Sequence, residues 1–295
     1  MGDSSNVTIV DDKSPICIPF ILERLHEYET SSSSSLAVSE ATARKPFIIG
    51  LNGVQGVGKT TLVQALATKL RCDEGLETLV CSLDDLYLTH ADQRALAAAH
   101  PDNQLVQVRG EPGTHDMELA RRFFAALCTG ERTKVPQYDK SLFAGEGDRV
   151  PESEWETVND TSAGQRPVQV VIFEGWCVGF RQLSAAELAH LELVNERLGA
   201  YEAVTGLFDA FIHIDAEDTG FVYEWRREQE VRLRREKGTG MTDEQVVRFV
   251  DAYYPAYELF SDQLRRGLFP AETQPGRQLR LVVGKDRKVR QTIVI

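Results

Sequence analysis

Cysteine is scarce in this sequence, and the cysteines that are present follow no pattern. There are five, an odd number without a C-x-x-C pair, at positions 17, 72, 81, 128 and 177. The sequence therefore indicates neither a disulfide framework nor a zinc site, and it fits a reducing compartment. Long apolar runs are also missing, since no stretch reaches the roughly 18 apolar residues that a membrane-spanning helix needs.

Basic residues are outnumbered. The 295-residue chain has 33 Lys and Arg against 45 Asp and Glu, which gives a formal net charge of −12. Binding to nucleic acids or anionic membranes depends on clustered Lys and Arg. We therefore expect neither as a partner, although a local basic pocket can still bind a small anion. Residues 1–15 are polar and acidic, unlike a signal or transit peptide, so we expect a cytoplasmic protein, with the nucleus as the alternative.

The length and the 42% apolar content fit one catalytic domain with an extension. We expect residues 1–35 to form the extension and residues 36–295 to form the domain. Apolar and aromatic residues at helical spacing predict a helix near the start of the extension. These residues are Phe20, Ile21, Leu25 and Tyr28. The serine run that follows predicts a flexible linker over residues 30–35.

From residue 47 onward, apolar β-rich runs alternate with helical patterns. Strands are expected over residues 47–51, 78–83, 168–173, 210–214 and 279–283. Helices are expected over residues 59–70, 116–128, 184–200, 220–236 and 242–266. This alternation predicts an α/β fold with a parallel sheet covered on both faces, and ligands bind such sheets at the carboxyl ends of the strands.

The first of these strands leads into a phosphate-binding motif. The string Gly53-Val-Gln-Gly-Val-Gly58-Lys59-Thr60 reads G-x-x-x-x-G-K-T and lies between an expected strand and an expected helix. In such a loop the backbone N–H groups surround phosphates, the lysine reaches the β- and γ-phosphates and the hydroxyl can bind Mg²⁺. The alternative, a Gly-rich turn with a surface lysine, does not account for this setting. The expected nucleotide-binding residues are Gly53, Val54, Gln55, Gly56, Val57, Gly58, Lys59, Thr60 and Thr61.

Acidic residues stand where two other strands end. Asp84 and Asp85 follow the strand over residues 79–83, and because neighbouring residues on an extended chain point opposite ways, only one is expected to face the nucleotide. A carboxylate there can take the proton of a substrate hydroxyl, although capping of the next helix is an equally good interpretation. Glu174 follows Val170–Phe173 at the Walker B position. A role beside Mg²⁺ is favoured over a cap, because the phosphate loop requires a metal partner.

Two loops are rich in polar residues and glycine. One runs from Arg109 to Asp116, and the other from Val135 to Arg149 with Lys140 inside it. Either can bind a substrate, but the residues alone slightly favour an N-cap for Asp116 and solvated charges for Lys140 and Arg149.

The helix expected over residues 220–236 carries Arg226, Glu230 and Arg234 at i, i+4 spacing. This ladder fits intrahelical ion pairs, and it also fits a lid that covers phosphates.

Together these motifs resemble the D-glycerate 3-kinase family, which includes plant-type glycerate kinase and fungal ATP-dependent kinases. The wider group contains phosphoribulokinase, uridine kinase and pantothenate kinase. The resemblance runs from Phe47 to Tyr257, and Leu86 departs from it because an aromatic residue is common there. The motifs behind it are the phosphate loop, Ser82-Leu-Asp-Asp-Leu-Tyr87, Arg109-Gly-Glu-Pro-Gly-Thr-His-Asp116, Pro136-Gln-Tyr-Asp-Lys-Ser141, Gly145-Glu-Gly-Asp-Arg149, Phe173-Glu-Gly-Trp176, Trp225-Arg226 and Gly240-Met-Thr-Asp-Glu-Gln245.

The resemblance implies a five-stranded, doubly wound, mainly parallel P-loop kinase core with helical insertions, using ATP and Mg²⁺. It implies that Lys59, Asp84 and Arg226 are catalytic, with Asp84 as the base and Arg226 on the transferred phosphoryl group. Thr60 and Glu174 are the expected metal-binding residues. The expected acceptor-binding residues are Asp85, Tyr87, Arg109, His115, Asp116, Tyr138, Lys140 and Arg149.

The predicted reaction transfers the γ-phosphoryl group of ATP to a small hydroxy acid, with D-glycerate, giving the 3-phospho ester, as the preferred acceptor. One alternative is a kinase for another hydroxylated metabolite, such as a nucleoside or pantothenate. The other is a nucleotide-binding regulator that hydrolyses ATP without an acceptor. No N/T-K-x-D guanine-binding motif occurs, which argues against a GTPase.

Overall fold

The computed structural model describes residues 11–35, 45–183, 191–238 and 240–295. The helices are α1 (Ser14–Ser35), α2 (Lys59–Cys72), α3 (His90–Ala99), α4 (Met117–Thr129), α5 (Glu192–Leu198), α6 (Glu202–Thr205), α7 (Phe221–Lys237) and α8 (Asp243–Arg266). The strands are β1 (Phe47–Gly53), β2 (Thr78–Ser82), β3 (Thr133–Lys134), β4 (Tyr138–Asp139), β5 (Asp148–Arg149), β6 (Thr157–Val158), β7 (Val170–Gly175), β8 (Ala210–Ala216), β9 (Gln278–Val283) and β10 (Val289–Val294).

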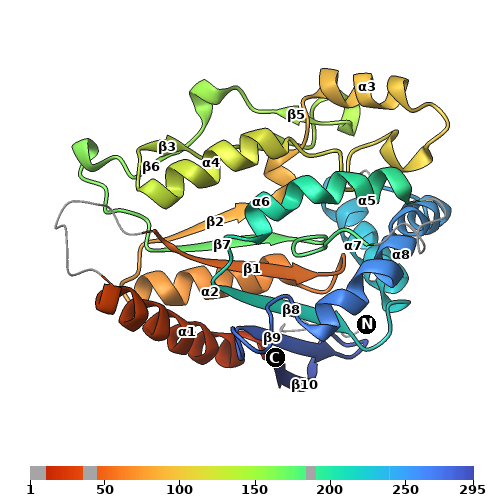
Figure 1. Cartoon of the computed structure of the whole chain (residues 1–295). Coiled ribbons are helices and arrows are strands. Elements are labelled where there is room, and N and C mark those ends of the chain that lie inside the picture. Colours follow the sequence, from red (N-terminus) through yellow and green to blue (C-terminus); the bar gives the residue numbers. More distant parts are fainter. Residues whose placement is uncertain (1–10, 36–44, 184–190, 239) are drawn as a thin grey trace, which may run out of the picture.

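The central sheet has six strands in the order β10-β9-β8-β1-β7-β2 (Figure 1). All pairs are parallel except β9 with β10, which form an antiparallel hairpin at one edge. The five expected strands are confirmed, and so is the doubly wound α/β fold. β10 was not expected from the sequence. Its residues are mostly exposed, so it lacks the apolar run by which a buried strand is recognised.

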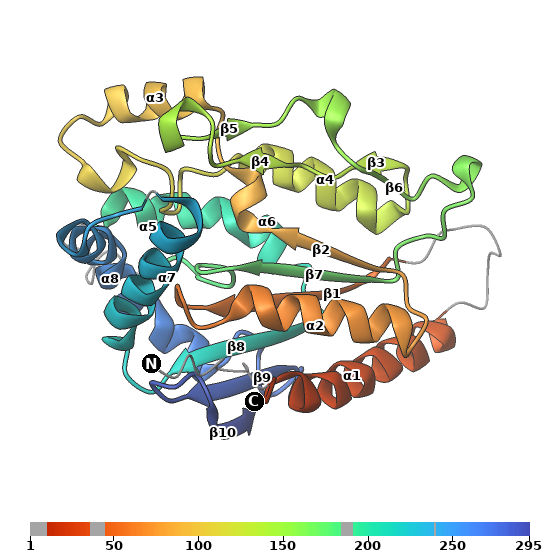
Figure 2. The same ribbon diagram turned by 180° about the vertical axis from the view of Figure 1, so that it is seen from behind.

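Helices cover both faces of the sheet. α2 packs on one face with α1 beside it (Figure 2), and α4, α5, α6 and α8 lie on the other (Figure 1). Every residue of β1 and β8 is buried, because parallel strands between two helical layers have no face in contact with water. Because β1, β7 and β2 are parallel, their carboxyl ends lie at the same edge of the sheet. At this edge β1 continues into the phosphate loop.

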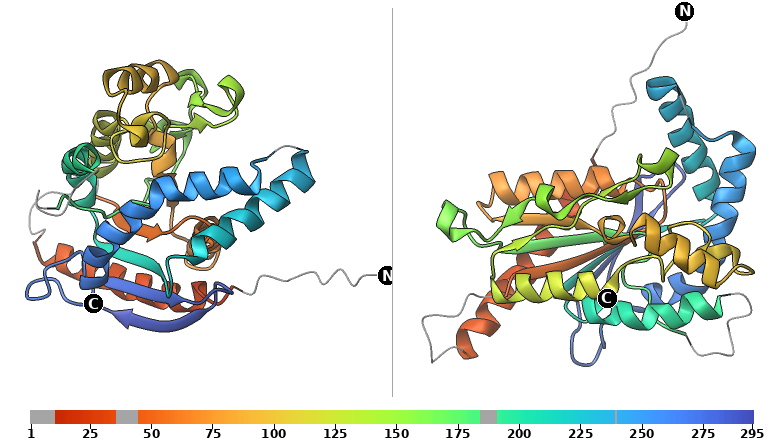
Figure 3. Two further views of the ribbon diagram at one scale, coloured as in Figure 1. Left: turned by 90° about the vertical axis from the view of Figure 1, so that its right-hand side faces the viewer. Right: turned by 90° about the horizontal axis from the view of Figure 1, so that it is seen from above.

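Short elements of the polar middle of the chain lie above this edge. They are α3 and the small ribbon formed by β4 with β5, whereas the ribbon formed by β3 with β6 lies toward the opposite end of the sheet, where β7 begins (Figure 1). α3 has no buried residue, which explains why no apolar stripe marks it in the sequence. At the same end, α7 and α8 form an antiparallel pair that extends beyond the sheet (Figure 3).

The expected flexible linker over residues 30–35 is wrong. α1 continues to Ser35, because serine, unlike proline, costs a helix only a few tenths of a kcal/mol per residue. The earlier part of α1 packs into the same core as the sheet, through residues that include Cys17, Phe20 and Ile21. The division of the chain into an extension and a domain stays a prediction.

The helix expected over residues 184–200 corresponds to α5 in its second half only, since residues 184–190 lie outside the described residues. Among the residues that are described, no helix is both long enough and apolar enough to cross a membrane.

Candidate functional site

The phosphate loop joins the buried strand β1 to the first turn of α2. Gly56 and Gly58 have φ angles of 77° and 100°, in the left-handed region that favours glycine. A Cβ on Gly56 would lie 2.6 Å from Cβ of Trp225, so this position also needs glycine for space. Because α2 begins at Lys59, its free N–H groups point into the loop, as anion binding requires.

Lys59 folds back over its own loop. Its Nζ atom donates to the carbonyl oxygens of Gly53 at 2.7 Å and Val54 at 3.3 Å. Burial lowers the pKa of Lys59, whereas the charges of Glu174 and Asp84 act in the opposite direction. The ammonium group is therefore held beside two carboxylates and over the loop, in reach of a phosphate group bound there.

A cleft of about 1150 Å³ opens from this loop across the carboxyl ends of β2 and β7. Its walls come from the phosphate loop, the first turn of α2, α3 and the chain after it, the loop over residues 140–146, and α7 and α8. Twelve of the sequence-predicted site residues line it. They are Gln55, Gly56, Gly58, Lys59, Thr60, Thr61, Asp84, Tyr87, Arg109, Lys140, Glu174 and Arg226.

The remaining predicted residues do not line the cleft but lie close behind its walls. They are Gly53, Val54 and Val57 of the phosphate loop, and Asp85, His115, Asp116, Tyr138 and Arg149 from the expected acceptor site. The structure thus separates the predicted residues into a layer that faces the cleft and a layer that supports it.

Asp84 and Lys140 form an ion pair inside the cleft, with Nζ of Lys140 2.5 Å from Oδ2 of Asp84. Burial favours the neutral form of Asp84, but the charge and hydrogen bond of Lys140 hold the pKa of this carboxyl below its ordinary value. Asp84 is therefore a carboxylate at neutral pH, as a proton acceptor must be. It does not cap α3, since Thr89 fills that position.

Asp85 does not line the cleft. Only one of the two neighbouring acids, Asp84, faces it. The Oδ1 atom of Asp85 accepts a hydrogen bond of 3.3 Å from the backbone N–H of Tyr138. Burial raises the pKa of Asp85 to about 6, and the negative charge of Asp84 adds to the shift. The two neighbouring carboxyls thus have pKa values shifted in opposite directions.

Glu174 lies in β7, directly opposite Leu51 of β1 and Ser82 of β2. The Ser82 hydroxyl donates a hydrogen bond of 2.9 Å to Oε1 of Glu174, which fixes the carboxylate beside the first turn of α2. No group of three or more His, Cys, Asp or Glu side chains within the described ranges could hold a metal by itself. One carboxylate and a threonine hydroxyl instead suit Mg²⁺, which is usually held by few protein ligands together with substrate phosphates.

His115 is buried behind Asp84 and stacks on the ring of Tyr87, with centroids 4.5 Å apart. Burial lowers the pKa of His115 to about 4, so the ring is neutral. The Tyr201 hydroxyl accepts from the N–H of Gly113 and lies 2.6 Å from Nδ1 of His115. The Tyr201 hydroxyl therefore holds the His115 ring in place behind Tyr87.

The three acceptor-site residues Arg109, Arg149 and Asp116 have different positions. Arg109 lines the cleft, and its Nη1 atom donates to the carbonyl oxygens of Gly145, at 2.8 Å, and Glu146. Arg149 instead donates to the carbonyl of Tyr87 at 2.8 Å and to Asp116 at 3.1 Å. Asp116 also caps α4 by accepting from Leu119 N–H. Arg149 and Asp116 thus brace the wall, whereas Arg109 itself reaches the cleft.

Arg226 joins the cleft from α7. It forms an i, i+4 ion pair with Glu230 at 2.5 Å, and its guanidinium lies 4.7 Å from the centre of the Phe249 ring of α8. Only the first half of the expected ladder is present, since Arg234 forms its ion pair with Asp243 and not with Glu230. The pair with Glu230 does not turn Arg226 away from the cleft. Glu230 is only 2% exposed and accepts a further hydrogen bond from Met241 N–H, so the arginine is held in a defined position.

Several contributors were not found from the sequence. Ser82 and Tyr201 act through hydrogen bonds to Glu174 and His115, and Tyr253 and Phe249 line the cleft from α8. The available signals were the apolar and aromatic residues at helical spacing in α8 and the position of Ser82 at the end of a strand.

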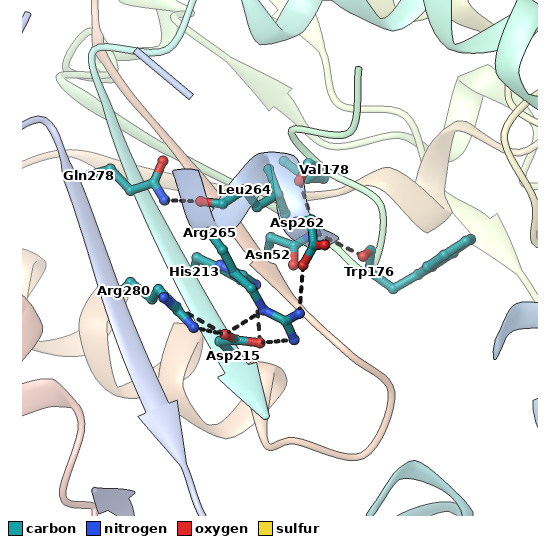
Figure 4. Close-up of polar contacts among 10 residues, drawn as sticks. All are labelled: Asn52, Trp176, Val178, His213, Asp215, Asp262, Leu264, Arg265, Gln278 and Arg280. Carbon is teal, nitrogen blue, oxygen red and sulfur yellow. Dashed lines mark hydrogen bonds and ion pairs between the residues drawn. The ribbon is translucent and has the colours of Figure 1, made fainter. Parts of the chain in front are cut away.

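Polar contacts anchor the C-terminal end of α8 to β8, beside β9 (Figure 4). Asp215 accepts from Arg265 of α8 at 3.0 and 3.1 Å and from Arg280 of β9 at 2.6 and 2.9 Å. Burial opposes ionisation of Asp215, but the hydrogen bonds and charges of the two arginines hold its pKa below the ordinary value. Asn52 bonds the carbonyls of Trp176 and Val178. Asp215 thus fixes α8 to the sheet, and Asn52 separately fixes the chain after Glu174.

Comparisons with known proteins agree with this site. No family model matches the chain. It is 40% identical over 232 residues to the uncharacterized kinase mug58 of Schizosaccharomyces pombe, which covers 73% of this chain and 81% of that protein. It is 37% identical over 252 residues to the chloroplastic D-glycerate 3-kinase of Arabidopsis thaliana, covering 82% of this chain and about half (53%) of that protein. The solved D-glycerate 3-kinase of Cryptococcus neoformans is 33% identical, with a TM-score of 0.81, and the match covers 96% of this chain and 99% of that one.

The chain belongs to the D-glycerate 3-kinase family. The resemblance noted in the sequence is therefore confirmed. As a member of this family, the chain is a P-loop kinase that uses ATP and a small-molecule acceptor. In this chain, the cleft lies between the phosphate loop and the segments that are inserted after β2.

Proposed function

We propose that this kinase transfers the γ-phosphoryl group of ATP to the 3-hydroxyl of D-glycerate, giving ADP and 3-phosphoglycerate. The observation that carries the proposal is the placement of Asp84. It is a carboxylate inside the same cleft as the phosphate loop, it forms an ion pair with Lys140, and Arg109 lines the same cleft. A base between the nucleotide and an anion-binding wall suits an acceptor that has both a hydroxyl and a carboxylate group.

In the proposed reaction, Asp84 takes the proton of the acceptor hydroxyl while its oxygen attacks the γ-phosphorus in line with the departing ADP. Such transfer depends on positioning and on charge stabilisation rather than on covalent catalysis. Lys59 and Arg226 line the cleft on the nucleotide side and supply positive charge for the phosphoryl oxygens. Mg²⁺ neutralises phosphate charge when it is bound, and Thr60 and Glu174 are the residues that would hold it.

The acceptor is assigned to the opposite wall. Arg109 and Lys140 bind its carboxylate, and Tyr87, stacked on His115, shapes the pocket below Asp84. Asp85, Asp116, Tyr138 and His115 contribute from behind the wall. Arg149 acts through its hydrogen bonds to the Tyr87 carbonyl and Asp116.

We also propose that the kinase acts in the cytoplasm, on small molecules and not on nucleic acids. The net charge of −12 supports this assignment, because it opposes general binding to polyanions. Residues 1–35 are proposed to be an extension of the kinase domain, and α1 within it packs on the sheet.

A screen of acceptors tests the function. ADP release is measured with D-glycerate, L-glycerate, glycerol, pantothenate and uridine, with Lys59→Ala as the inactive control because it removes a cation from the cleft but no core packing. Stimulation by D-glycerate above all other compounds is the expected result. A larger stimulation by uridine or pantothenate would assign a different acceptor, and ATP hydrolysis that no compound stimulates would support the regulatory ATPase.

A further inference from the structure

The β9–β10 turn lies at the same edge of the sheet as the phosphate loop and contacts it. Arg287 in this turn donates from Nε to the carbonyl oxygen of Gly56, at 2.8 Å. Arg287 has a φ angle of 62°, a left-handed conformation that non-glycine residues seldom adopt. The turn is closed by a hydrogen bond of 2.8 Å from Arg287 N–H to the carbonyl of Gly284. No part of the proposed reaction uses this arginine.

The contact fixes the orientation of one peptide group in the loop. Since the C=O and N–H of a trans peptide point in opposite directions, holding the Gly56 carbonyl outward turns the N–H of Val57 inward. That N–H lies 3.4 Å from the carbonyl oxygen of Val54, inside the loop. Arg287 thus helps to fix the conformation of the loop whose N–H groups would surround a phosphate.

The same arginine connects the loop to α7. Its guanidinium lies 5.3 Å from the centre of the Trp225 ring and forms an ion pair of 2.5 Å with Glu228. Trp225 is 1% exposed, is in contact with Gly56, and donates from Nε1 to the carbonyl of Lys285 at 2.7 Å. Arg226, the next residue of α7, lines the cleft. The phosphate loop, α7 and the β9–β10 turn therefore pack against one another around Trp225 and Arg287.

Residues before α1 hold the turn from the other side. Nζ of Lys13 donates to the carbonyl of Arg287 at 2.5 Å, and Oδ2 of Asp12 accepts from the N–H of Val289 at 2.8 Å. Asp12 and Lys13 also form an ion pair of 2.9 Å with each other. The beginning of the described chain is thereby tied to the turn that contacts the phosphate loop.

We propose that Arg287 is a positioning residue for phosphoryl transfer, which orients the phosphate loop through the Gly56 carbonyl and aligns it with α7, and that Asp12 and Lys13 support it. This inference rests on the proposed use of ATP at the loop and not on the identity of the acceptor. It predicts an effect on nucleotide binding that loss of fold stability alone does not produce.

The test compares Arg287→Gln with Arg290→Gln in the full chain. Arg290 belongs to the same hairpin and bonds Asp286, with no hydrogen bond to the phosphate loop. Affinity for a non-hydrolysable ATP analogue with Mg²⁺ is measured by calorimetry, together with KM, kcat and Tm. We expect Arg287→Gln to weaken analogue binding and raise KM for ATP by about tenfold, a change of about 1.4 kcal/mol, with KM for the acceptor unchanged. Arg290→Gln should stay close to the parent, and Arg287→Lys should recover part of the loss.

A second variant keeps the test decisive if Arg287→Gln does not fold. The double variant Asp12→Ala with Lys13→Met leaves Arg287 in place and should weaken analogue binding in the same direction, by a smaller factor. Unchanged analogue affinity in every variant that folds, even with a lower Tm, would reduce Arg287 to a structural role and overturn the proposal. Because the calorimetry needs no acceptor, its result does not depend on whether D-glycerate is the substrate.

Discussion

The Lys140 ammonium lies 2.5 Å from the Asp84 carboxylate, between the phosphate loop and the polar wall of the cleft. Lys140 is more exposed than Asp84, with 55% and 30% of the side chains accessible. The lysine can therefore move to an incoming anion, while the aspartate stays in place. The pair links two functions in the proposed mechanism, since the same cation keeps the base ionised and meets the acceptor.

Replacing Lys140 should change the pH dependence of the reaction. The lysine holds the pKa of Asp84 below its ordinary value, so in Lys140→Met the pKa rises and the base is lost at a higher pH. The acid limb of the kcat profile, recorded from about pH 5 to about pH 9, should move upward, with the smallest loss of activity at high pH. Lys140→Arg, which keeps the charge, should stay near the parent. Coinciding acid limbs in parent and Lys140→Met would contradict the role of the pair.

Removing the base itself should affect turnover more than binding. Asp84→Asn is expected to lower kcat by roughly 10²–10⁴, the usual contribution of a general base. ATP affinity should change little, because the phosphate loop is intact. Steady-state kinetics with both substrates measures this. Asp85→Asn is the matched control, and a larger loss of kcat in that variant than in Asp84→Asn would exchange the roles of the two acids.

Asp85→Asn should instead change stability. The pKa of Asp85 is about 6 in the folded chain, above its ordinary value of 3.8. A carboxyl whose pKa is higher in the folded chain than in the unfolded chain stabilises the fold at a pH below its pKa in the unfolded chain. This stabilisation is lost as the pH rises through the pKa that the carboxyl has in the folded chain. Ionised Asp85 therefore destabilises the fold above about pH 6, by up to about 3 kcal/mol. Asn can still accept from Tyr138 N–H, so Asp85→Asn should raise Tm near pH 8. Near pH 4 the gain should vanish, and an equal gain at both pH values would exclude this cause.

Glu174 should determine the response to magnesium. Glu174→Gln is expected to raise the Mg²⁺ concentration for half-maximal activity by at least about tenfold. Ser82→Ala removes the hydrogen bond that orients this carboxylate and should act in the same direction, more weakly. A titration of activity with Mg²⁺ at saturating ATP tests both variants. If neither titration moves, Glu174 is a structural residue of β7.

The sequence predicts those parts of the fold that depend on local patterns. The phosphate loop and Glu174 are fixed by contiguous residues beside apolar strands, and all five parallel strands were found in this way. α3 was missed because it buries no residue. Its available signals were the cap formed by Thr89 and Asp92 and the alanines that follow. β10 was missed because an edge strand with exposed side chains has no apolar run.

The acceptor wall shows why the site was harder to predict than the fold. Arg109 and Arg149 have equivalent chemistry in the sequence, and their roles differ only because β5 turns Arg149 toward Asp116 and the Tyr87 carbonyl. Similarly, the stacking of Tyr87 on His115 depends on the bridge that joins these two residues across segments distant in the chain. Contacts of this kind depend on the tertiary structure and leave no periodic signal in the sequence.

Arg109 should determine how well the enzyme recognises the carboxylate of the acceptor. A charge-assisted hydrogen bond to a carboxylate contributes about 1.5–3 kcal/mol, so Arg109→Met should raise KM for D-glycerate by about tenfold or more. KM for ATP should stay nearly unchanged, because Arg109 lies on the wall opposite the phosphate loop. Glycerol, which lacks the carboxylate, should be a poor acceptor for the parent enzyme, and Arg109→Met should reduce the difference between the two compounds.

Arg149→Met supplies the contrast, because this arginine bonds Asp116 and the Tyr87 carbonyl and does not line the cleft. It should lower Tm more than Arg109→Met does, and raise KM for D-glycerate less. If Arg149→Met gives the larger increase in KM while Arg109→Met leaves it unchanged, the carboxylate is bound behind the present wall. That outcome would require β4 and β5 to move when the acceptor binds, because both hydrogen-bond partners of Arg149 would have to be released.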